Sequence, residues 1–188
     1  MKADSDHRGL LVLVVGPSGA GKDTLIGYCR ERLCGDPAVV FPRRVVTRQE
    51  SAHEDHHTVD HADFDKEVAC GAYALHWRAH GLGYGVPASI HDDLARGRCV
   101  VVNVSRTVVA EARLRFRPLR IALVTAPPEV LAARLAARGR ESAADVDSRI
   151  ARAPASVVGE DVVVIDNSGF VEEAGDRLLA VIRGEIGR

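Results

Sequence analysis

The sequence predicts an α/β domain with a mainly parallel, five-stranded sheet flanked by helices. Its short apolar runs are uniformly hydrophobic rather than alternating, which is typical of strands buried on both faces of such a sheet. Segments of helical composition lie between these runs, as expected where helices return the chain to the start of the next parallel strand. The runs that we interpret as strands are residues 10–15, 99–102, 121–124 and 162–165.

Length and composition favour one globular domain. The chain has 188 residues, of which 46% are hydrophobic and 27% are charged. Its 25 Lys and Arg residues nearly balance its 26 Asp and Glu residues, so we expect neither nucleic acid nor a membrane as a partner. The four cysteines form no paired motif and no signal peptide is readable, so we expect free thiols and a cytoplasmic location. The oligomeric state stays open.

Changes in composition divide the predicted domain into three parts. We expect a core at about residues 9–41, 97–133 and 154–188, an insertion at about 42–96, and a short arginine-rich lid at about 134–153. The lid has arginines on both sides of Gly139, and a helix break that carries cations suits a mobile lid. Helices are expected at residues 23–33, 62–70, 88–96, 131–137, 143–153 and 172–186, and short strands at 73–77 and 83–85.

The segment GPSGAGKDT follows the first predicted strand and has the spacing of a phosphate-binding P-loop. Its glycines let backbone N–H groups approach a polyphosphate, and Lys22 reaches the transferred group. Asp23 stands where a Ser or Thr usually contacts magnesium, and we predict that its carboxylate binds Mg²⁺ instead. The predicted nucleotide-binding residues of this loop are Gly16, Pro17, Ser18, Gly19, Ala20, Gly21, Lys22, Asp23 and Thr24.

Several further segments follow the P-loop in one order: RRVVTRQESAHED, HGLGYGVP, GRCVVVNVSR, RLAARGRES and VVIDNSG. Together they resemble the guanylate kinase superfamily, which has a P-loop kinase fold. Within it, GKD, NVSR and RGRES look like the ribose 1,5-bisphosphate phosphokinase family. This resemblance implies a kinase that uses ATP and magnesium to phosphorylate the 1-phosphate of ribose 1,5-bisphosphate. The products would be ADP and 5-phosphoribosyl 1-diphosphate (PRPP), in phosphonate catabolism.

The resemblance also implies roles for single residues. Besides the loop, it assigns nucleotide contacts to Arg134 and Asn167. Its catalytic cations are Lys22, Arg138 and Arg149. The acceptor-binding residues, most of them in the insertion, are Arg43, Arg44, Arg48, His56, Tyr84, Ser105, Arg106 and Arg140.

Three positions depart from guanylate kinase. Where that enzyme holds guanine with a serine, a glutamate and a second hydroxyl, this sequence has Arg44, His76 and Val86. Guanine presents N–H donors, so these replacements remove acceptors that its recognition needs. We therefore expect a cationic acceptor site with no guanine pocket, and we expect His76 and Trp77 to be packing residues of the insertion.

Other functions stay open at this point. A guanylate or other nucleoside monophosphate kinase is the first alternative, and a non-catalytic guanylate-kinase-like binding module is the second. The histidines and carboxylates between His53 and His61 could also suggest zinc, but their spacing fits no familiar zinc site. A solvated loop with one or two phosphate contacts is the preferred interpretation.

Overall fold

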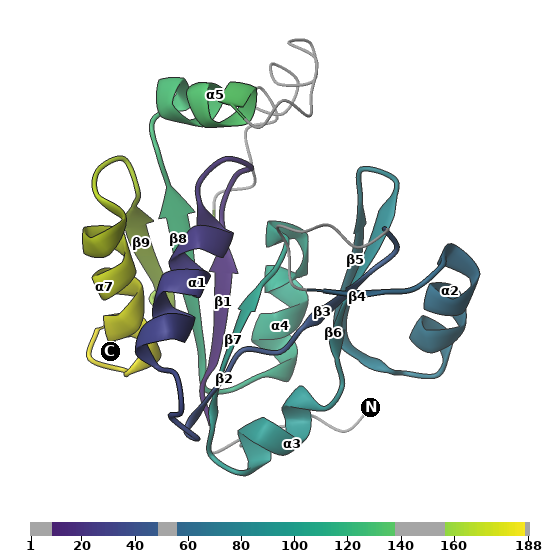
Figure 1. Ribbon diagram of the computed structural model, residues 1–188. Coiled ribbons are helices and arrows are strands. Elements are labelled where there is room, and N and C mark those ends of the chain that lie inside the picture. Colours follow the sequence, from purple (N-terminus) through teal and green to yellow (C-terminus); the bar gives the residue numbers. More distant parts are fainter. Residues whose placement is uncertain (1–8, 49–55, 138–156, 187–188) are drawn as a thin grey trace. The chain divides into compact units, whose positions relative to one another are not determined.

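The computed structural model describes residues 9–48, 56–137 and 157–186 (Figure 1). Within this part of the chain no helix has the length and apolar character needed to cross a membrane. The chain forms two compact units. One comprises residues 1–11 and 35–119, and the other comprises residues 12–34 and 120–188. The predicted division into core, insertion and lid follows other boundaries and stays a prediction.

The unit of residues 12–34 and 120–188 carries the P-loop segment. Its strands and helices are β1 (Leu11–Val15), α1 (Lys22–Arg32), β8 (Leu119–Thr125), α5 (Pro128–Ala137), β9 (Val162–Asp166) and α7 (Val171–Ile182). All five residues of β1 are buried, as its uninterrupted apolar run predicts. Strands β8 and β9 pair in parallel, with Ile121 next to Val162 at one end and Thr125 next to Asp166 at the other.

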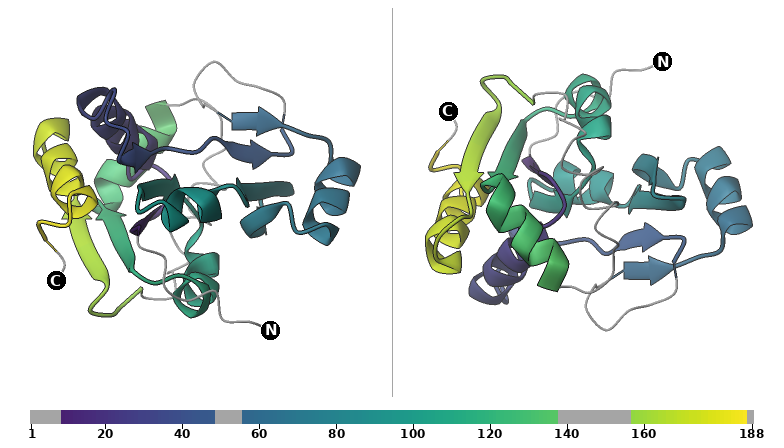
Figure 2. Two further views of the ribbon diagram at one scale, coloured as in Figure 1. Left: turned by 90° about the horizontal axis from the view of Figure 1, so that it is seen from below. Right: turned by 90° about the horizontal axis from the view of Figure 1, so that it is seen from above.

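Helices α1 and α7 pack side by side in this unit, as the two views of Figure 2 show. Gly175 of α7 allows their close approach, since a Cβ atom there would lie 2.4 Å from the ring of Tyr28 in α1. The Tyr28 hydroxyl donates to Asp176 at 2.6 Å, and the Arg32 guanidinium lies 3.4 Å from the centre of the Tyr28 ring. These contacts hold the ring over the glycine.

The other unit carries most of the predicted insertion. Its elements are β2 (Val39–Val40), β3 (Arg44–Val46), β4 (His56–Thr58), α2 (His61–Ala69), β5 (Tyr73–Ala79), β6 (Leu82–Pro87), α3 (Ile90–Ala95), β7 (Cys99–Asn103), the 3₁₀ helix η1 (Arg106–Val108) and α4 (Val109–Arg115). Strands β4, β3, β6 and β5 form a four-stranded sheet in that order. Strand β3 pairs in parallel with β4 and antiparallel with β6, and β5 and β6 form a hairpin.

Helix α2 lies beside the β5–β6 hairpin (Figure 1) and contacts both of its strands. Phe64 of α2 and Tyr73 of β5 stack with ring centres 5.1 Å apart. Their rings lie directly on Gly83 and Gly85, where a Cβ atom would come within 2.7 Å and 2.4 Å of them. The glycine-rich composition of β6 is therefore explained by the aromatic layer that covers it.

The larger sheet has the strand order β2-β7-β1-β8-β9, with parallel pairs β2–β7 and β8–β9. The predicted α/β fold with a mainly parallel five-stranded sheet flanked by helices is confirmed. The helix expected at 62–70 is α2. The two short strands expected at 73–77 and 83–85 are β5 and β6, and both are longer than expected. Strands β2, β3 and β4 were not predicted because each has only two or three residues. The helix expected at 143–153 lies outside the described residues.

All four cysteines are free thiols, as expected. Burial raises the pKa of the Cys29 thiol in α1 and of the Cys99 thiol in β7 to about 12. Both thiols are therefore protonated at neutral pH.

Two helical glycines give a matched test of the α1–α7 contact. Gly175→Ala is expected to lower the free energy of unfolding by about 1–3 kcal/mol, because the new methyl group overlaps the Tyr28 ring. Gly27→Ala, in α1, is the control: a Cβ atom there meets nothing within 4 Å. Since alanine is the better helix former, Gly27→Ala should raise stability by about 0.5–1 kcal/mol. Urea denaturation of both variants measures this, and equal shifts would contradict the packing argument.

Candidate active site

The P-loop has the shape of a phosphate cradle. It leaves β1 at Gly16, where a Cβ atom would lie 2.2 Å from the backbone carbonyl of Val124 in β8, so only glycine fits. Helix α1 begins at Lys22. The Lys22 ammonium donates to the carbonyls of Gly16 and Pro17, both at 2.9 Å. The lysine side chain therefore lies across the loop. The loop stands at the N-terminus of α1, where backbone N–H groups favour an anion.

Asn167, at the end of β9, braces the loop. Its backbone N–H donates to the Thr125 carbonyl at 2.8 Å, and its side-chain Nδ2 donates to the Ala20 carbonyl at 2.7 Å. Gly21 has a left-handed backbone with φ of 86°, and a Cβ atom there would lie 2.4 Å from Asn167 Nδ2. The amide thus fixes the backbone immediately before the lysine, and it needs a glycine to reach it.

Two buried polar atoms beside the loop fit a nucleotide. Asn167 is only 2% exposed, and its Oδ1 has no hydrogen-bond partner in the described part of the chain. Nη1 of Arg134 in α5 is also buried and has no hydrogen-bond partner among the described residues. This atom would lie 3.9 Å from a Cβ atom at Gly21. One atom is an acceptor and the other a charged donor, and buried groups of both kinds normally have partners. A bound nucleotide would supply an amino group to one and an anionic oxygen to the other.

Asp23 and Thr24 are exposed in the first turn of α1. A carboxylate there complements the helix dipole, and it is also a suitable oxygen ligand for magnesium beside substrate phosphates. Among the described residues, no group of three or more His, Cys, Asp or Glu side chains is placed to hold a metal. Asp23 as a magnesium ligand stays a prediction.

The candidate acceptor residues lie on the four-stranded sheet. Strand register places Arg44 of β3 next to His56 of β4, and Val46 opposite Tyr84 of β6. Since neighbours in register share a face, and alternate residues of a strand do too, Arg44, His56 and Tyr84 belong to one face of this sheet. His56 is 1% exposed, while Arg44 and Tyr84 are partly exposed. Arg43 Nη2 donates to the His56 carbonyl at 2.9 Å and so ties the start of β3 to β4.

The hairpin register corrects one sequence-based expectation. His76 pairs with Gly85 and is exposed, so the prediction that it packs in the interior was wrong. Leu75 instead pairs with Val86, and both side chains are fully buried. The error arose because counting along the chain cannot show which face of the hairpin a residue occupies. Trp77 pairs with Tyr84, is 8% exposed and stacks on its ring, so its expected packing role is confirmed.

Ser105 and Arg106 follow β7, in the same unit as the four-stranded sheet. The Ser105 hydroxyl accepts from Thr107 N at 3.3 Å and so caps η1. Burial lowers the pKa of the Arg106 guanidinium below its ordinary value. A partly desolvated cation of this kind suits an anionic ligand.

Three predicted arginines, Arg138, Arg140 and Arg149, lie outside the described residues, as do residues 53–55 of the histidine-rich segment. The remaining candidates fall into two groups, one in each unit. Residues 16–24, Arg134 and Asn167 form a nucleotide group, and the acceptor group comprises Arg43, Arg44, Arg48, His56, Tyr84, Ser105 and Arg106.

Comparison with known proteins gives close relatives. The chain is 51% identical over 175 residues to "Ribose 1,5-bisphosphate phosphokinase PhnN" of Methylobacterium radiotolerans, covering 93% of this chain and 98% of the relative. It is 53% identical over 174 residues to the protein of the same name from Acidiphilium cryptum, covering 93% and 92%. The chain belongs to the ribose 1,5-bisphosphate phosphokinase family. No family model matches it.

Solved structures similar to this family member agree on the fold. A guanylate kinase from Anaplasma phagocytophilum matches with a TM-score of 0.69 at 22% identity, covering 94% of this chain and 86% of that one. A gluconokinase from Sinorhizobium meliloti matches with a TM-score of 0.52 at 18% identity, covering 96% and 95%. The predicted P-loop kinase fold and the resemblance to guanylate-kinase-like kinases are therefore confirmed.

The brace on the loop can be removed without a large change in volume. Asn167→Leu removes the donor to the buried Ala20 carbonyl, and leaving such a group unsatisfied costs about 1–3 kcal/mol of stability. We also expect a raised KM for the nucleotide. Ser168→Ala, at the exposed neighbouring residue, is the control. Urea denaturation and steady-state kinetics measure both effects, and a nucleotide KM equal to that of wild type in Asn167→Leu would contradict the bracing role.

Proposed function

We propose that this protein transfers the γ-phosphoryl group of ATP to the 1-phosphate of ribose 1,5-bisphosphate, giving PRPP and ADP. The observation that carries the proposal is identity of about one half, over more than nine-tenths of the chain, to relatives named as ribose 1,5-bisphosphate phosphokinases. Phosphonate catabolism and a cytoplasmic location, both expected from the sequence, are part of this proposal.

The acceptor sheet supports a sugar bisphosphate better than a purine. Val86 stands at one of the three positions that hold guanine in guanylate kinase, and it is fully buried together with Leu75, with which it pairs. The other two positions carry Arg44 and the exposed His76, so a purine would find no carboxylate or hydroxyl at any of the three, which costs affinity. Arg44, His56 and Tyr84, on the same face as that buried pair, instead supply donors for phosphate oxygens.

The transfer itself needs little covalent help from the protein. An oxygen of the acceptor 1-phosphate attacks the γ-phosphorus of ATP, and the bond from that phosphorus to the bridging oxygen of ADP breaks. The attacking phosphate is already largely anionic at neutral pH because its second pKa is near ~6, so no general base is required. Catalysis then depends on positioning two polyanions in line and on balancing their charge.

The charge is balanced by residues of this chain. Lys22 would exchange its contacts with the loop carbonyls for phosphate oxygens, and backbone N–H groups of residues 18–24 would hold the β-phosphate. Arg138 and Arg149 are proposed to neutralise the transferred group. Magnesium would add positive charge between the phosphates, and Asp23 is its proposed ligand. Strand β7 ends at Asn103 and is followed by Val104 and Ser105, so no acid stands there and Asp23 would supply the carboxylate.

A substrate panel tests the function. The purified protein, with ATP and magnesium, is expected to release ADP with ribose 1,5-bisphosphate and to form PRPP, but to release little with GMP, AMP, CMP or UMP. Lys22→Ala should lower kcat by about 10²–10³, the effect of removing one group that stabilises a charged transition state. Strong turnover with GMP and none with the sugar bisphosphate would favour a nucleoside monophosphate kinase. If wild type shows no ATP turnover beyond that of Lys22→Ala with any of these acceptors, a non-catalytic binding module is favoured.

A magnesium titration tests Asp23. Asp23→Ser restores the more usual hydroxyl but removes the proposed carboxylate ligand, so the magnesium concentration for half-maximal activity should rise roughly tenfold, as for other changes in ligand charge. Glu31→Ser, an exposed acid at the other end of α1, is the matched control. An unchanged magnesium requirement in Asp23→Ser would remove this role.

A further inference from the structure

Arg48, a candidate acceptor residue, lies two residues beyond the end of β3, and Tyr84, another, lies on the neighbouring strand β6. Val46, at the end of β3, is in register with Tyr84 of β6. The next residues along the two strands are Thr47 and Gly83, and Arg48 follows Thr47. The pairing of Thr47 with Gly83 is therefore the link in the chain nearest to both Arg48 and Tyr84, and a change in this pairing is expected to move Arg48 relative to Tyr84.

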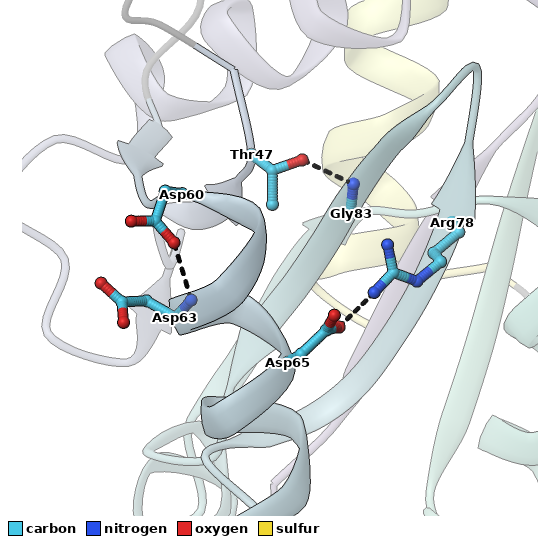
Figure 3. Close-up of polar contacts among 6 residues, drawn as sticks. All are labelled: Thr47, Asp60, Asp63, Asp65, Arg78 and Gly83. Atoms are coloured by element: carbon cyan, nitrogen blue, oxygen red, sulfur yellow. Dashed lines mark hydrogen bonds and ion pairs between the residues drawn. The ribbon is translucent and has the colours of Figure 1, made fainter.

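Thr47 and Gly83 are joined by two hydrogen bonds. The Thr47 backbone N–H donates to the Gly83 carbonyl at 3.0 Å. The Gly83 N–H donates to the Thr47 hydroxyl oxygen at 2.8 Å, the bond drawn in Figure 3. In a regular antiparallel ladder the second bond would go to the backbone carbonyl of the facing residue. Here the side chain takes that place, so β3 can end at Val46 and the chain can turn at Arg48 while Gly83 stays satisfied.

This junction is rigid on both sides. Thr47 is only 7% exposed, and Gly83 is covered by the Phe64 ring, which would lie 2.7 Å from a Cβ atom there. From β4, the Thr58 hydroxyl donates to the Arg48 carbonyl at 2.8 Å. The backbone of Arg48 is thus fixed by one threonine before it in the chain and by another on the neighbouring strand.

We propose that Thr47 and Thr58 are positioning residues that hold Arg48 at the correct distance from Tyr84, and that they thereby set the affinity for the acceptor phosphate. Neither hydroxyl touches the acceptor in this proposal. The inference rests on the proposed function in one respect, namely that Arg48 and Tyr84 bind the phosphate of the acceptor.

Thr47→Val is the decisive variant, because valine has nearly the shape of threonine but gives the buried Gly83 N–H no acceptor. We expect the acceptor KM to rise roughly tenfold, the factor that corresponds to one such hydrogen bond, with kcat and the KM for ATP unchanged. Thr47→Ser keeps the hydroxyl and should restore the wild-type acceptor KM. Thr58→Val, at an exposed residue, should raise the acceptor KM about threefold to tenfold.

A binding measurement that does not depend on turnover is available in the same unit. Trp77 is the single tryptophan of the chain, and its ring stacks on that of Tyr84 with centres 5.2 Å apart and planes 3° apart. Its fluorescence should therefore change when the acceptor binds at Tyr84, and a titration gives the Kd. Thr47→Val should raise this Kd by the same factor as the KM.

Asp65→Asn is the matched control. It removes the ion pair between Asp65 of α2 and Arg78 of β5, which lies directly opposite Gly83 in the hairpin (Figure 3). Both side chains of this pair are more than half exposed, so the variant alters the same hairpin without affecting Thr47. Its acceptor KM should equal that of wild type.

The outcomes separate this inference from the proposed function. If wild type does not phosphorylate ribose 1,5-bisphosphate, the proposed function is wrong, and the variants are compared with whichever mononucleotide wild type does phosphorylate. If Thr47→Val and Thr58→Val both keep the wild-type acceptor KM and Kd, the positioning role is wrong. If Thr47→Val does not fold, Thr58→Val alone decides. A KM that rises equally in Asp65→Asn would also overturn the inference, because any loosening of the hairpin would then have the same effect.

Discussion

The side-chain amide of Asn167 donates to the carbonyl of Ala20, and the geometry of the phosphate loop depends on this bond. It joins the end of β9 to the residue that precedes Gly21, and the left-handed glycine lets the two come together. Lys22 then crosses back to the carbonyls of Gly16 and Pro17. A loop held in this way presents its N–H groups in a fixed arrangement, so little reorganisation is needed when a polyphosphate binds.

The same amide would couple nucleotide binding to the shape of the loop. Its Nδ2 is used within the protein, whereas its Oδ1 is buried and has no partner among the described residues. A ligand that donates to Oδ1 would hold the amide in the orientation that also supports Ala20. Binding of the base and ordering of the phosphate cradle would thus be favoured by one and the same side chain.

The parts of the fold that could be predicted are those that composition specifies locally. Strands β1, β7, β8 and β9 are continuous apolar runs, and the P-loop is set by glycines and a lysine at fixed spacing. The short strands β3 and β4 could not be predicted, because pairing with neighbours rather than local preference makes them strands. The error at His76 has the same origin, since strand register is a non-local property that reverses the face of every residue when it shifts by one. Nor could the sequence show that the hydroxyl of Thr47 replaces a backbone acceptor.

Register also explains how an acceptor site of this kind can be selective. Leu75 and Val86 pair across the hairpin with fully buried side chains, so the position that carries a guanine-binding hydroxyl in guanylate kinase offers no hydrogen-bond acceptor here. Arg44 and His56, adjacent across β3 and β4 on the same face, offer the opposite environment. A ligand whose polar groups are gathered into phosphates would suit this face, because its anionic oxygens would meet donors. Discrimination then follows from where polar groups are absent as much as from where cations are present.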